Sequence, residues 1–202
     1  RILGIAKGSG MIHPNMATML GFILTDVEIS SELLQQLLKE AVEESFNMIS
    51  VDGDTSTNDM VLALANGASE VRVDSPEDGV WEDFKIGLRE VSQQLAVAIA
   101  RDGEGASKLF EVRVNGAVST EDARLMARSV VSSNLVKAAL FGNDANWGRV
   151  VAAMGYSGAA FTPEKVEIRF TSGDREIMVM HQGQPVKFDE AQAAQILDHN
   201  EV

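Results

Sequence analysis

Short apolar runs alternate with amphipathic helical patterns along most of this chain. Residues 19–25 are nearly all apolar and have the length of a strand, which is typical of a strand buried on both faces. Ser30 or Ser31 then provides a helix cap, and apolar residues recur at helical spacing up to position 42. A second, longer helix is predicted from Phe84 to about Arg101, where apolar residues recur every three or four positions.

The segment between these two helices combines short apolar runs with a polar loop. Residues 48–51 form an apolar run with the character of a strand, and they lead into the loop at 52–59. Residues 60–65 are predicted as a helix that stops at Asn66 and Gly67. In this interpretation the loop side chains cap a helix that begins near Asp59.

The second half of the chain continues the alternation. Apolar residues alternate over 110–114, as in a half-buried strand, and Ser119 with an acid three residues later resembles a capping box. Residues 135–141 have the character of a strand, and 147–154 predict a short helix.

A hairpin is predicted within 166–179, and a last helix begins at Asp189. Because helices and strands alternate throughout, the sequence predicts a mixed α/β fold built on at least one buried sheet.

Length, composition and charge narrow the class of protein. The 202 residues are enough for one large domain or two small ones, and 45% hydrophobic with 23% charged residues is an ordinary globular composition. Lys+Arg 17 against Asp+Glu 30 gives a net charge of −13, which disfavours nucleic acid and anionic membranes as partners. No apolar run is long enough for a membrane helix, and no signal-peptide pattern is present, so we expect a cytoplasmic protein. The chain opens at Arg1 rather than Met, which suggests a piece of something longer.

Cysteine is absent, which excludes disulfides, a thiolate nucleophile and cysteine-based zinc sites. Asp52 and Asp54 follow an apolar run, as do the Mg²⁺-binding carboxylates of haloacid-dehalogenase-type phosphatases. The residues after them differ from that motif, and no Gly and no terminal Glu fall at the positions that an EF-hand loop requires. The histidines, at positions 13, 181 and 199, share no ligand spacing. A turn bonded by its own side chains is the competing interpretation, and we expect no metal; a Mg²⁺-dependent phosphatase stays an alternative.

Glu104 stands between Gly103 and Gly105, after a predicted helix and before a predicted strand. One interpretation is a tight turn that ends the helix. The other is a carboxylate held where backbone approaches a ligand closely, suited to a cationic amine. Spacing alone leaves both open, just as it leaves the polar loop 143–149 open between a helix cap and the rim of a pocket.

The most specific stretch is residues 7–20, with the sequence KGSGMIHPNMATML. It resembles the self-cleavage segment of the ornithine acetyltransferases (glutamate N-acetyltransferases of the cyclic arginine pathway), which are cut before a threonine in an Asn-Met-Ala-Thr-Met-Leu context. The likeness continues in order through further blocks, at 51–59, 103–108, 135–139, 141–149 and 155–158. Blocks in the same order over most of the chain exclude chance agreement.

The resemblance implies roles for particular residues. Ala17 and Thr18 flank the implied cleavage point, and Thr18 is the implied nucleophile and a substrate-binding residue. Cleavage frees the α-amine of Thr18, whose ordinary pKa of about 7.7–8.0 lets it act as the base for its own hydroxyl. Lys7 matches a substrate-binding lysine suited to the carboxylates of the substrates, and Glu104 matches a glutamate suited to the amino groups of ornithine.

The resemblance also implies a fold and a reaction. The fold would be a layered α/β sandwich of the ornithine acetyltransferase and β-aminopeptidase type, Ntn-hydrolase-like in mechanism. Residues 1–17 would end an α-chain segment, and 18–202 would be a β-chain domain that lacks its C-terminal part. The enzyme would move acetyl from N2-acetylornithine to glutamate through an acetyl-threonine intermediate, without a cofactor, and some members also take acetyl-CoA as donor. Its partner would be the N-terminal α chain, in an α/β heterotetramer.

Two alternatives stay open beside this enzyme. A related amidohydrolase, such as a β-aminopeptidase, passes the acyl group to water, but those enzymes use serine as nucleophile. The chain could also be an inactive half that needs its partner, because the oxyanion-hole threonine and glycine of the family belong to the N-terminal half. Loss of one such donor costs on the order of 3–4 kcal/mol of transition-state stabilisation.

Overall fold

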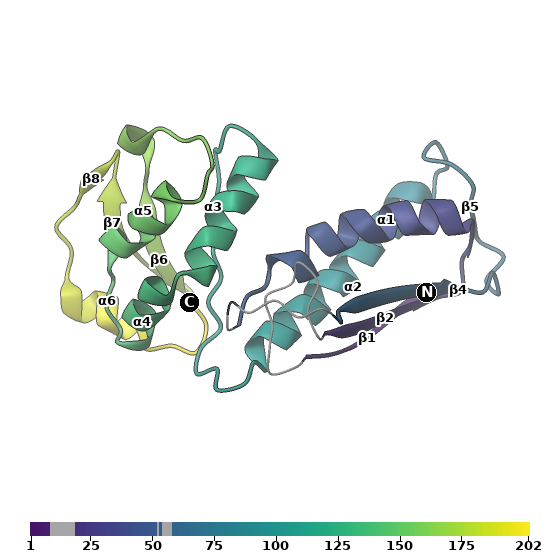
Figure 1. Ribbon diagram of the computed structural model, residues 1–202, viewed down its shortest axis with the longest axis horizontal. Helices are drawn as coiled ribbons and strands as arrows, with labels where there is room; N and C mark the ends of the chain where they lie inside the picture. Colours follow the sequence, from purple (N-terminus) through teal and green to yellow (C-terminus); the bar gives the residue numbers. More distant parts are fainter. Residues whose placement is uncertain (9–18, 52, 54–57) are drawn as a thin grey trace. The chain divides into compact units, whose positions relative to one another are not determined.

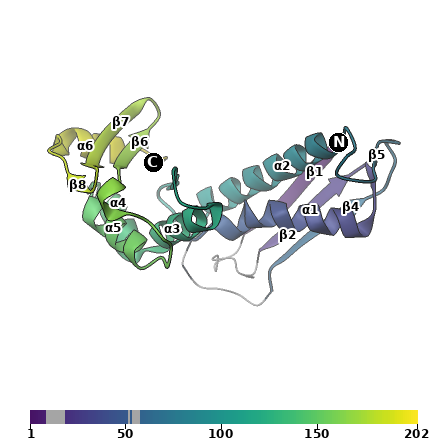
Figure 2. The ribbon, with the colours of Figure 1, turned by 90° about the horizontal axis from the view of Figure 1, so that it is seen from above.

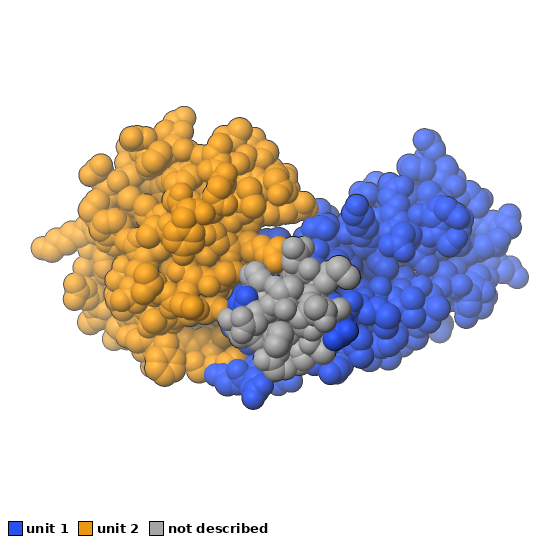
Figure 3. All heavy atoms as spheres, viewed as in Figure 1, with its two compact units in different colours: residues 1–105 blue, residues 106–202 orange. Residues whose placement is uncertain are grey.

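The computed structural model of the protein describes residues 1–8, 19–51, 53 and 58–202. These residues form two compact units, 1–105 and 106–202, which Figure 3 distinguishes by colour. Both units combine helices with strands, which confirms the prediction of a mixed α/β fold.

The first unit is built on a three-stranded sheet (Figure 1). Its strands are β1 (Ile2–Lys7), β2 (Leu20–Thr25) and β4 (Met60–Ala65), in the order β1-β2-β4. The central strand β2 is antiparallel to β1 and parallel to β4. Therefore β1, which precedes the predicted cleavage point, pairs with the strand that follows it.

Two helices cover one face of this sheet, α1 (Ser31–Glu43) and α2 (Trp81–Arg101), as Figures 1 and 2 show. Ser30 caps α1 by accepting a hydrogen bond from the backbone N–H of Leu33 at 3.3 Å, as the sequence predicted. A Cβ on Gly4 of β1 would lie 2.5 Å from Cγ1 of Val91, so the close approach of α2 to β1 depends on this glycine.

The opposite face of the sheet is also apolar, but the described residues do not bury it. Leu3, Ile5 and Leu64 are 56%, 55% and 51% exposed, whereas Ile23 on the helix-covered face is 1% exposed. We call this surface the open sheet face; it consists of Leu3, Ile5, Leu20, Phe22, Leu24, Met60, Leu62 and Leu64. The prediction that residues 19–25 form a strand is confirmed, but burial on both faces is wrong for the chain described.

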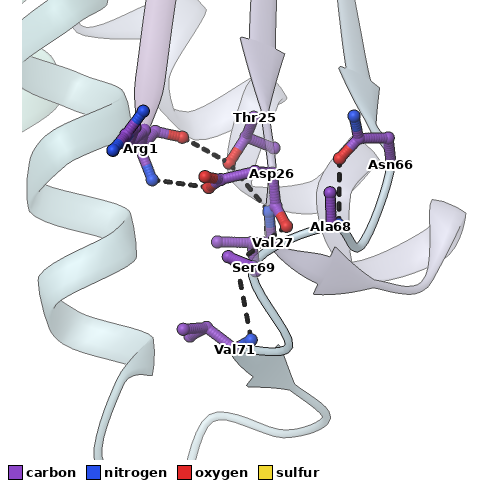
Figure 4. Close-up of polar contacts among 8 residues, drawn as sticks. All are labelled: Arg1, Thr25, Asp26, Val27, Asn66, Ala68, Ser69 and Val71. Carbon is purple, nitrogen blue, oxygen red and sulfur yellow. Dashed lines mark hydrogen bonds and ion pairs between the residues drawn. The ribbon is translucent and has the colours of Figure 1, made fainter.

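Turns close the sheet at the end where β2 stops (Figure 4). The Thr25 hydroxyl donates to the carbonyl of Arg1 at 2.9 Å, and the Ser69 hydroxyl donates to the carbonyl of Asp26 at 2.7 Å. Beyond these turns β3 (Glu28–Ile29) and β5 (Arg72–Val73) form a short parallel pair.

The second unit packs helices around a small antiparallel sheet with the strand order β6-β7-β8. Its elements are α3 (Thr120–Ser132), α4 (Asn134–Phe141), α5 (Trp147–Gly155), the 3-10 turn η2 (Pro163–Lys165), β6 (Ile168–Ser172), β7 (Arg175–His181), β8 (Gln184–Pro185) and α6 (Glu190–Leu197). The predicted cap is confirmed, since Ser119 accepts from the backbone N–H of Asp122 at 3.0 Å. Asp189 caps α6 and β6 pairs with β7, so the last helix and the hairpin are confirmed too.

Four local predictions are wrong, all on short apolar segments. Residues 60–65 form the strand β4 and not a helix, because parallel pairing with β2 satisfies their backbone groups. Residues 135–141 lie in the helix α4, which Ser133 caps. The predicted strand over 48–51 is absent: Met48 ends the 3-10 turn η1 (Phe46–Met48), and residues 49–51 form no strand. Residues 110–114 form no strand, although Leu109 makes one parallel bridge to Glu201.

Candidate functional site

One end of the first unit gathers the residues that the sequence singled out. Lys7 ends β1, and in the register of the sheet it lies opposite Leu20, which lies opposite Met60. Since β1 runs antiparallel to β2 while β4 runs parallel to it, the end of β1 meets the beginnings of β2 and β4. Lys7, Met19 and Asp59 therefore lie at the same edge of the sheet.

The end of α2 reaches this edge as well. A Cβ on Gly87 would lie 3.1 Å from Cδ1 of Ile2, and one on Gly4 would lie 2.7 Å from Cδ1 of Leu95, so α2 runs in the same direction as β1. Near its end, Ile99 packs in one cluster with Met19 and Val51. The turn that carries Glu104 therefore lies at the end of the sheet where Lys7 lies.

Gly103 anchors the turn that carries Glu104. A Cβ at Gly103 would lie 2.9 Å from Cγ1 of Val51, so a larger residue would push the turn away from Val51. Gly105 adopts a φ of 72°, a conformation that favours glycine. The tight turn after the helix is therefore confirmed, and Glu104 projects from it as an exposed side chain.

Lys7 is also exposed, on the same side of the sheet as the open sheet face. Its ammonium and the Glu104 carboxylate offer one positive and one negative group near the beginning of β2. Lys7 can bind a carboxylate, and Glu104 can bind an amine.

Several predicted residues lie outside the described part of the chain. Ala17 and Thr18, the implied cleavage point and nucleophile, are among them, as are Asp52 and Asp54. Met19, which Thr18 precedes directly, is described and is only 2% exposed. The structure therefore fixes the point at which the strand after Thr18 begins.

Asp59 holds the beginning of this strand, at Met19, in place. Its Oδ1 accepts a short hydrogen bond from the backbone N–H of Met19, and the N–H of Met60 donates to the carbonyl of Met19 at 3.0 Å. The other carboxylate oxygen, Oδ2, is buried and has no hydrogen-bond partner among the described residues. Burial raises the pKa of Asp59, and the Met19 N–H opposes that rise only in part.

Sequence reasoning missed this role. Asp59 was expected in a loop that caps a helix, which is wrong because Met60 begins a strand. No local pattern links positions 19 and 59, since only the parallel pairing of β2 with β4 brings them together. The signal that was available, an acid directly before an apolar run, is too common to identify a site.

The second unit contains a groove, but none of the predicted site residues lines it. The groove has a volume of about 930 Å³ and lies between residues 109–118 and 165–173, with parts of α3 and α5 in its wall. Several of its charged groups form ion pairs, as Arg113 does with Glu111 at 2.6 Å and Arg169 with Glu167 at 2.9 Å. In the loop 143–149, the Asn146 side chain accepts from the backbone N–H of Arg149 at 3.1 Å. Of the two interpretations of this loop, the structure therefore supports the helix cap.

Comparison with known proteins gives a consistent result. The model of the ArgJ family matches residues 1–202. The arginine biosynthesis bifunctional protein ArgJ 1 of Clostridium acetobutylicum is 55% identical over 201 residues, which is 100% of this chain and 49% of that protein. The arginine biosynthesis bifunctional protein ArgJ of Thermotoga neapolitana is 55% identical over 202 residues, 100% of this chain and 51% of that protein.

A solved structure is similar in fold as well as in sequence. The crystal structure of the arginine biosynthesis bifunctional protein ArgJ from Bacillus halodurans has a TM-score of 0.84 and 42% sequence identity, and the match covers 91% of this chain and 84% of that chain. The α/β fold type implied by the resemblance is therefore confirmed. The chain spans about half the length of the curated relatives it matches.

The raised pKa of Asp59 leads to a testable prediction about stability. Because burial disfavours the ionised carboxylate, the folded protein loses stability as the pH rises from the ordinary aspartate pKa through the raised pKa of Asp59. In the variant Asp59→Asn, the amide oxygen would still accept from the Met19 N–H, but the side chain would carry no charge. We expect this variant to be more stable at pH 7, with a gain that disappears below the ordinary aspartate pKa of about 3.9.

Denaturant unfolding between pH 3 and pH 8 measures this difference. The substitution is compared in full-length protein that already carries Thr18→Ala, so that self-cleavage does not change the surroundings of Asp59. A stability difference that is the same at pH 3 and at pH 8 would contradict the prediction.

Proposed function

Because this chain belongs to the ArgJ family, we propose that it is the nucleophile-bearing part of an acetyltransferase of arginine biosynthesis. In this proposal, acetyl moves from N2-acetylornithine to glutamate through an ester on Thr18. The observation that carries it is the gathering of Lys7, Met19 and the Glu104 turn at one end of the first unit. Thr18 is joined covalently to Met19, so the implied nucleophile belongs to the same end.

The proposed reaction has two halves. First, the Thr18 hydroxyl attacks the acetyl carbonyl, its proton passes to the free α-amine of Thr18, and ornithine leaves with a proton on its amine. Next, the amino nitrogen of glutamate attacks the ester, the acetyl group moves to that nitrogen, and the hydroxyl of Thr18 takes back a proton. The enzyme ends as it began, without a metal or a resident cofactor.

Lys7 and Glu104 would orient the substrates. An exposed ammonium binds a carboxylate without first losing a partner inside the protein, and the same holds for an exposed carboxylate and an amine. We therefore assign Lys7 to the substrate carboxylates and Glu104 to the amino group of ornithine. Thr18 itself contacts the acetyl group.

The two alternative activities receive less support. The relatives' names contain "arginine biosynthesis" and "bifunctional", which fits glutamate N-acetyltransferase together with acetyl-CoA-dependent amino-acid N-acetyltransferase better than hydrolysis by an amidohydrolase. A phosphatase would need Asp52 and Asp54 as metal ligands, and the match of the family model to the whole chain favours acetyl transfer.

The partner would be the rest of the full-length protein. The chain spans 49% and 51% of two relatives, and the open sheet face presents a continuous apolar surface. Apolar surface of this extent is stabilised when another layer covers it. We propose that the N-terminal α chain covers it, within an α/β heterotetramer in the cytoplasm. Among the described helices, none is long and apolar enough to span a bilayer.

The first test of this function is Thr18→Ala in the full-length protein. The wild-type protein should yield two chains, the second beginning at Thr18, because the bond between Ala17 and Thr18 is cut. Without the hydroxyl, the variant should stay one chain and lose about 10³-fold or more of its acetyl transfer. Intact mass and N-terminal sequencing measure the cleavage, with Thr162→Ala at an exposed threonine of the second unit as the control. Cleavage of the Thr18→Ala variant before position 18 would refute the assignment.

A second test concerns Glu104. Glu104→Gln removes the negative charge from an exposed side chain, so the fold should be unchanged. A hydrogen bond to a charged group is worth about 1.5–3 kcal/mol, so kcat/KM for N2-acetylornithine should fall about 10- to 150-fold. The matched control is Glu90→Gln, at an exposed glutamate of α2. If both variants keep the wild-type kcat/KM, Glu104 does not bind substrate and is only a residue of the turn.

A third test concerns the open sheet face. Leu64→Asp places a charge where we propose that the α chain packs, so the α chain should dissociate from a tagged β chain after self-cleavage. Leu135→Asp is the control, because Leu135 is 62% exposed on α4 in the second unit. Recovery of equal amounts of α chain with both variants would speak against this interface.

A further inference from the structure

We propose that Asp59 is the positioning residue for the nucleophile. One carboxylate oxygen holds the peptide group between Thr18 and Met19, and the other receives the α-ammonium group that self-cleavage creates on Thr18. This inference rests on the proposed function, because it requires that cleavage occurs before Thr18.

The first half of the inference stands on a hydrogen bond in the structure. The nitrogen that donates to Oδ1 of Asp59 belongs to Met19, and it is the nitrogen of the peptide bond that Thr18 makes. The same peptide chain is held from the next residue of β4, since Met60 N–H donates to the Met19 carbonyl at 3.0 Å. Asp59 and the first residue of β4 thus fix the backbone directly after the nucleophile.

The second half follows from covalent geometry. The α-nitrogen of Thr18 is three bonds away from the amide nitrogen of Met19, so the two atoms are at most about 3.7 Å apart in any conformation. Since Oδ1 is hydrogen-bonded to that amide nitrogen, the α-nitrogen always lies within the range of about 4–6 Å at which opposite charges act, or close to it.

The unpaired oxygen indicates what the carboxylate lacks. Oδ2 of Asp59 is buried without a hydrogen-bond partner among the described residues, and an unpaired buried carboxylate oxygen is costly. Before cleavage the Thr18 nitrogen is an uncharged amide with a single N–H. Cleavage turns it into an amine that can carry three N–H donors and a positive charge, which is the group that a buried carboxylate would bind.

This contact would assist the chemistry as well as the geometry. When the Thr18 hydroxyl attacks the acetyl carbonyl, its proton moves to the α-amine, and a positive charge develops on that nitrogen. The Asp59 carboxylate would stabilise this charge, as a buried carboxylate stabilises the imidazolium in a Ser-His-Asp triad. Among the described residues, the other charged groups at this end are exposed to water, which screens them: Lys7 at the end of β1, and Arg101, Asp102 and Glu104 at the end of α2.

Asp59→Asn in the full-length protein tests the proposal. Asparagine still offers an oxygen to the Met19 N–H, but it removes the charge that favours the protonated amine. The limb of the kcat/KM profile that rises with pH reports the loss of a proton from the Thr18 amine. We expect its midpoint to move about one pH unit lower in the variant, and kcat at the plateau to fall about tenfold, while KM changes less than twofold.

Two further variants separate this role from a structural one. Asp59→Glu keeps the charge, so its midpoint should stay near that of the wild type. Asp78→Asn is the matched control, because the Asp78 carboxylate accepts from the backbone N–H groups of Asp74 and Ser75 at 2.6 and 2.8 Å in the turn before α2. It should leave both the midpoint and kcat unchanged.

Purification of the self-cleaved protein before the assay makes the measurement independent of the rate of self-cleavage. An Asp59→Asn profile with the wild-type midpoint would overturn the inference, even if this variant were less stable or cleaved slowly. If the wild-type protein transferred no acetyl group, the proposed function itself would fail. Transfer by the wild type together with the lowered midpoint in Asp59→Asn supports both.

Discussion

The first unit depends on the hydrogen bonding of β2 to a neighbouring strand on each side. β2 is antiparallel to β1 and parallel to β4, so the end of one strand and the beginnings of two others meet at one edge of the sheet. A parallel pair also requires a crossover between its strands, and α1 provides it between β2 and β4. If β4 were antiparallel to β2, Asp59 would lie at the opposite end from Met19.

The same sheet has one face buried by helices and one exposed apolar face. Its helix-covered face is a core in itself, with Ile23, Leu37 and Leu88 each 1% exposed. The open sheet face has side chains of the same type but no covering layer among the described residues. Lys7 lies on that side of the sheet, so a covering chain would pack beside the group that we assign to substrate carboxylates.

The Asp59 carboxylate is placed for a function although its burial lowers the stability of the folded protein. A neutral side chain at this position would avoid the burial of a charge, yet the carboxylate is placed where the strand after Thr18 begins, with one oxygen unpaired among the described residues. Groups with a pKa perturbed by burial gather at functional sites because their charge is put to use there. In our proposal, the positive charge that the carboxylate lacks is produced by the cleavage reaction.

The sequence by itself determined the family, the long helices and their caps. It could do so because the family motifs are contiguous, because α1 carries both a helical period and a capping serine, and because α2 carries a helical period and α3 a capping serine. Residues 60–65 were predicted as a helix and form a strand, and residues 135–141 were predicted as a strand and form a helix. A short apolar run has no period that distinguishes the two. Only the tertiary structure decided residues 60–65, through their pairing with β2, whereas residues 135–141 form a helix that Ser133 caps. It also decided the contact of Asp59 with Met19, because two residues forty positions apart meet only when their strands pair in register.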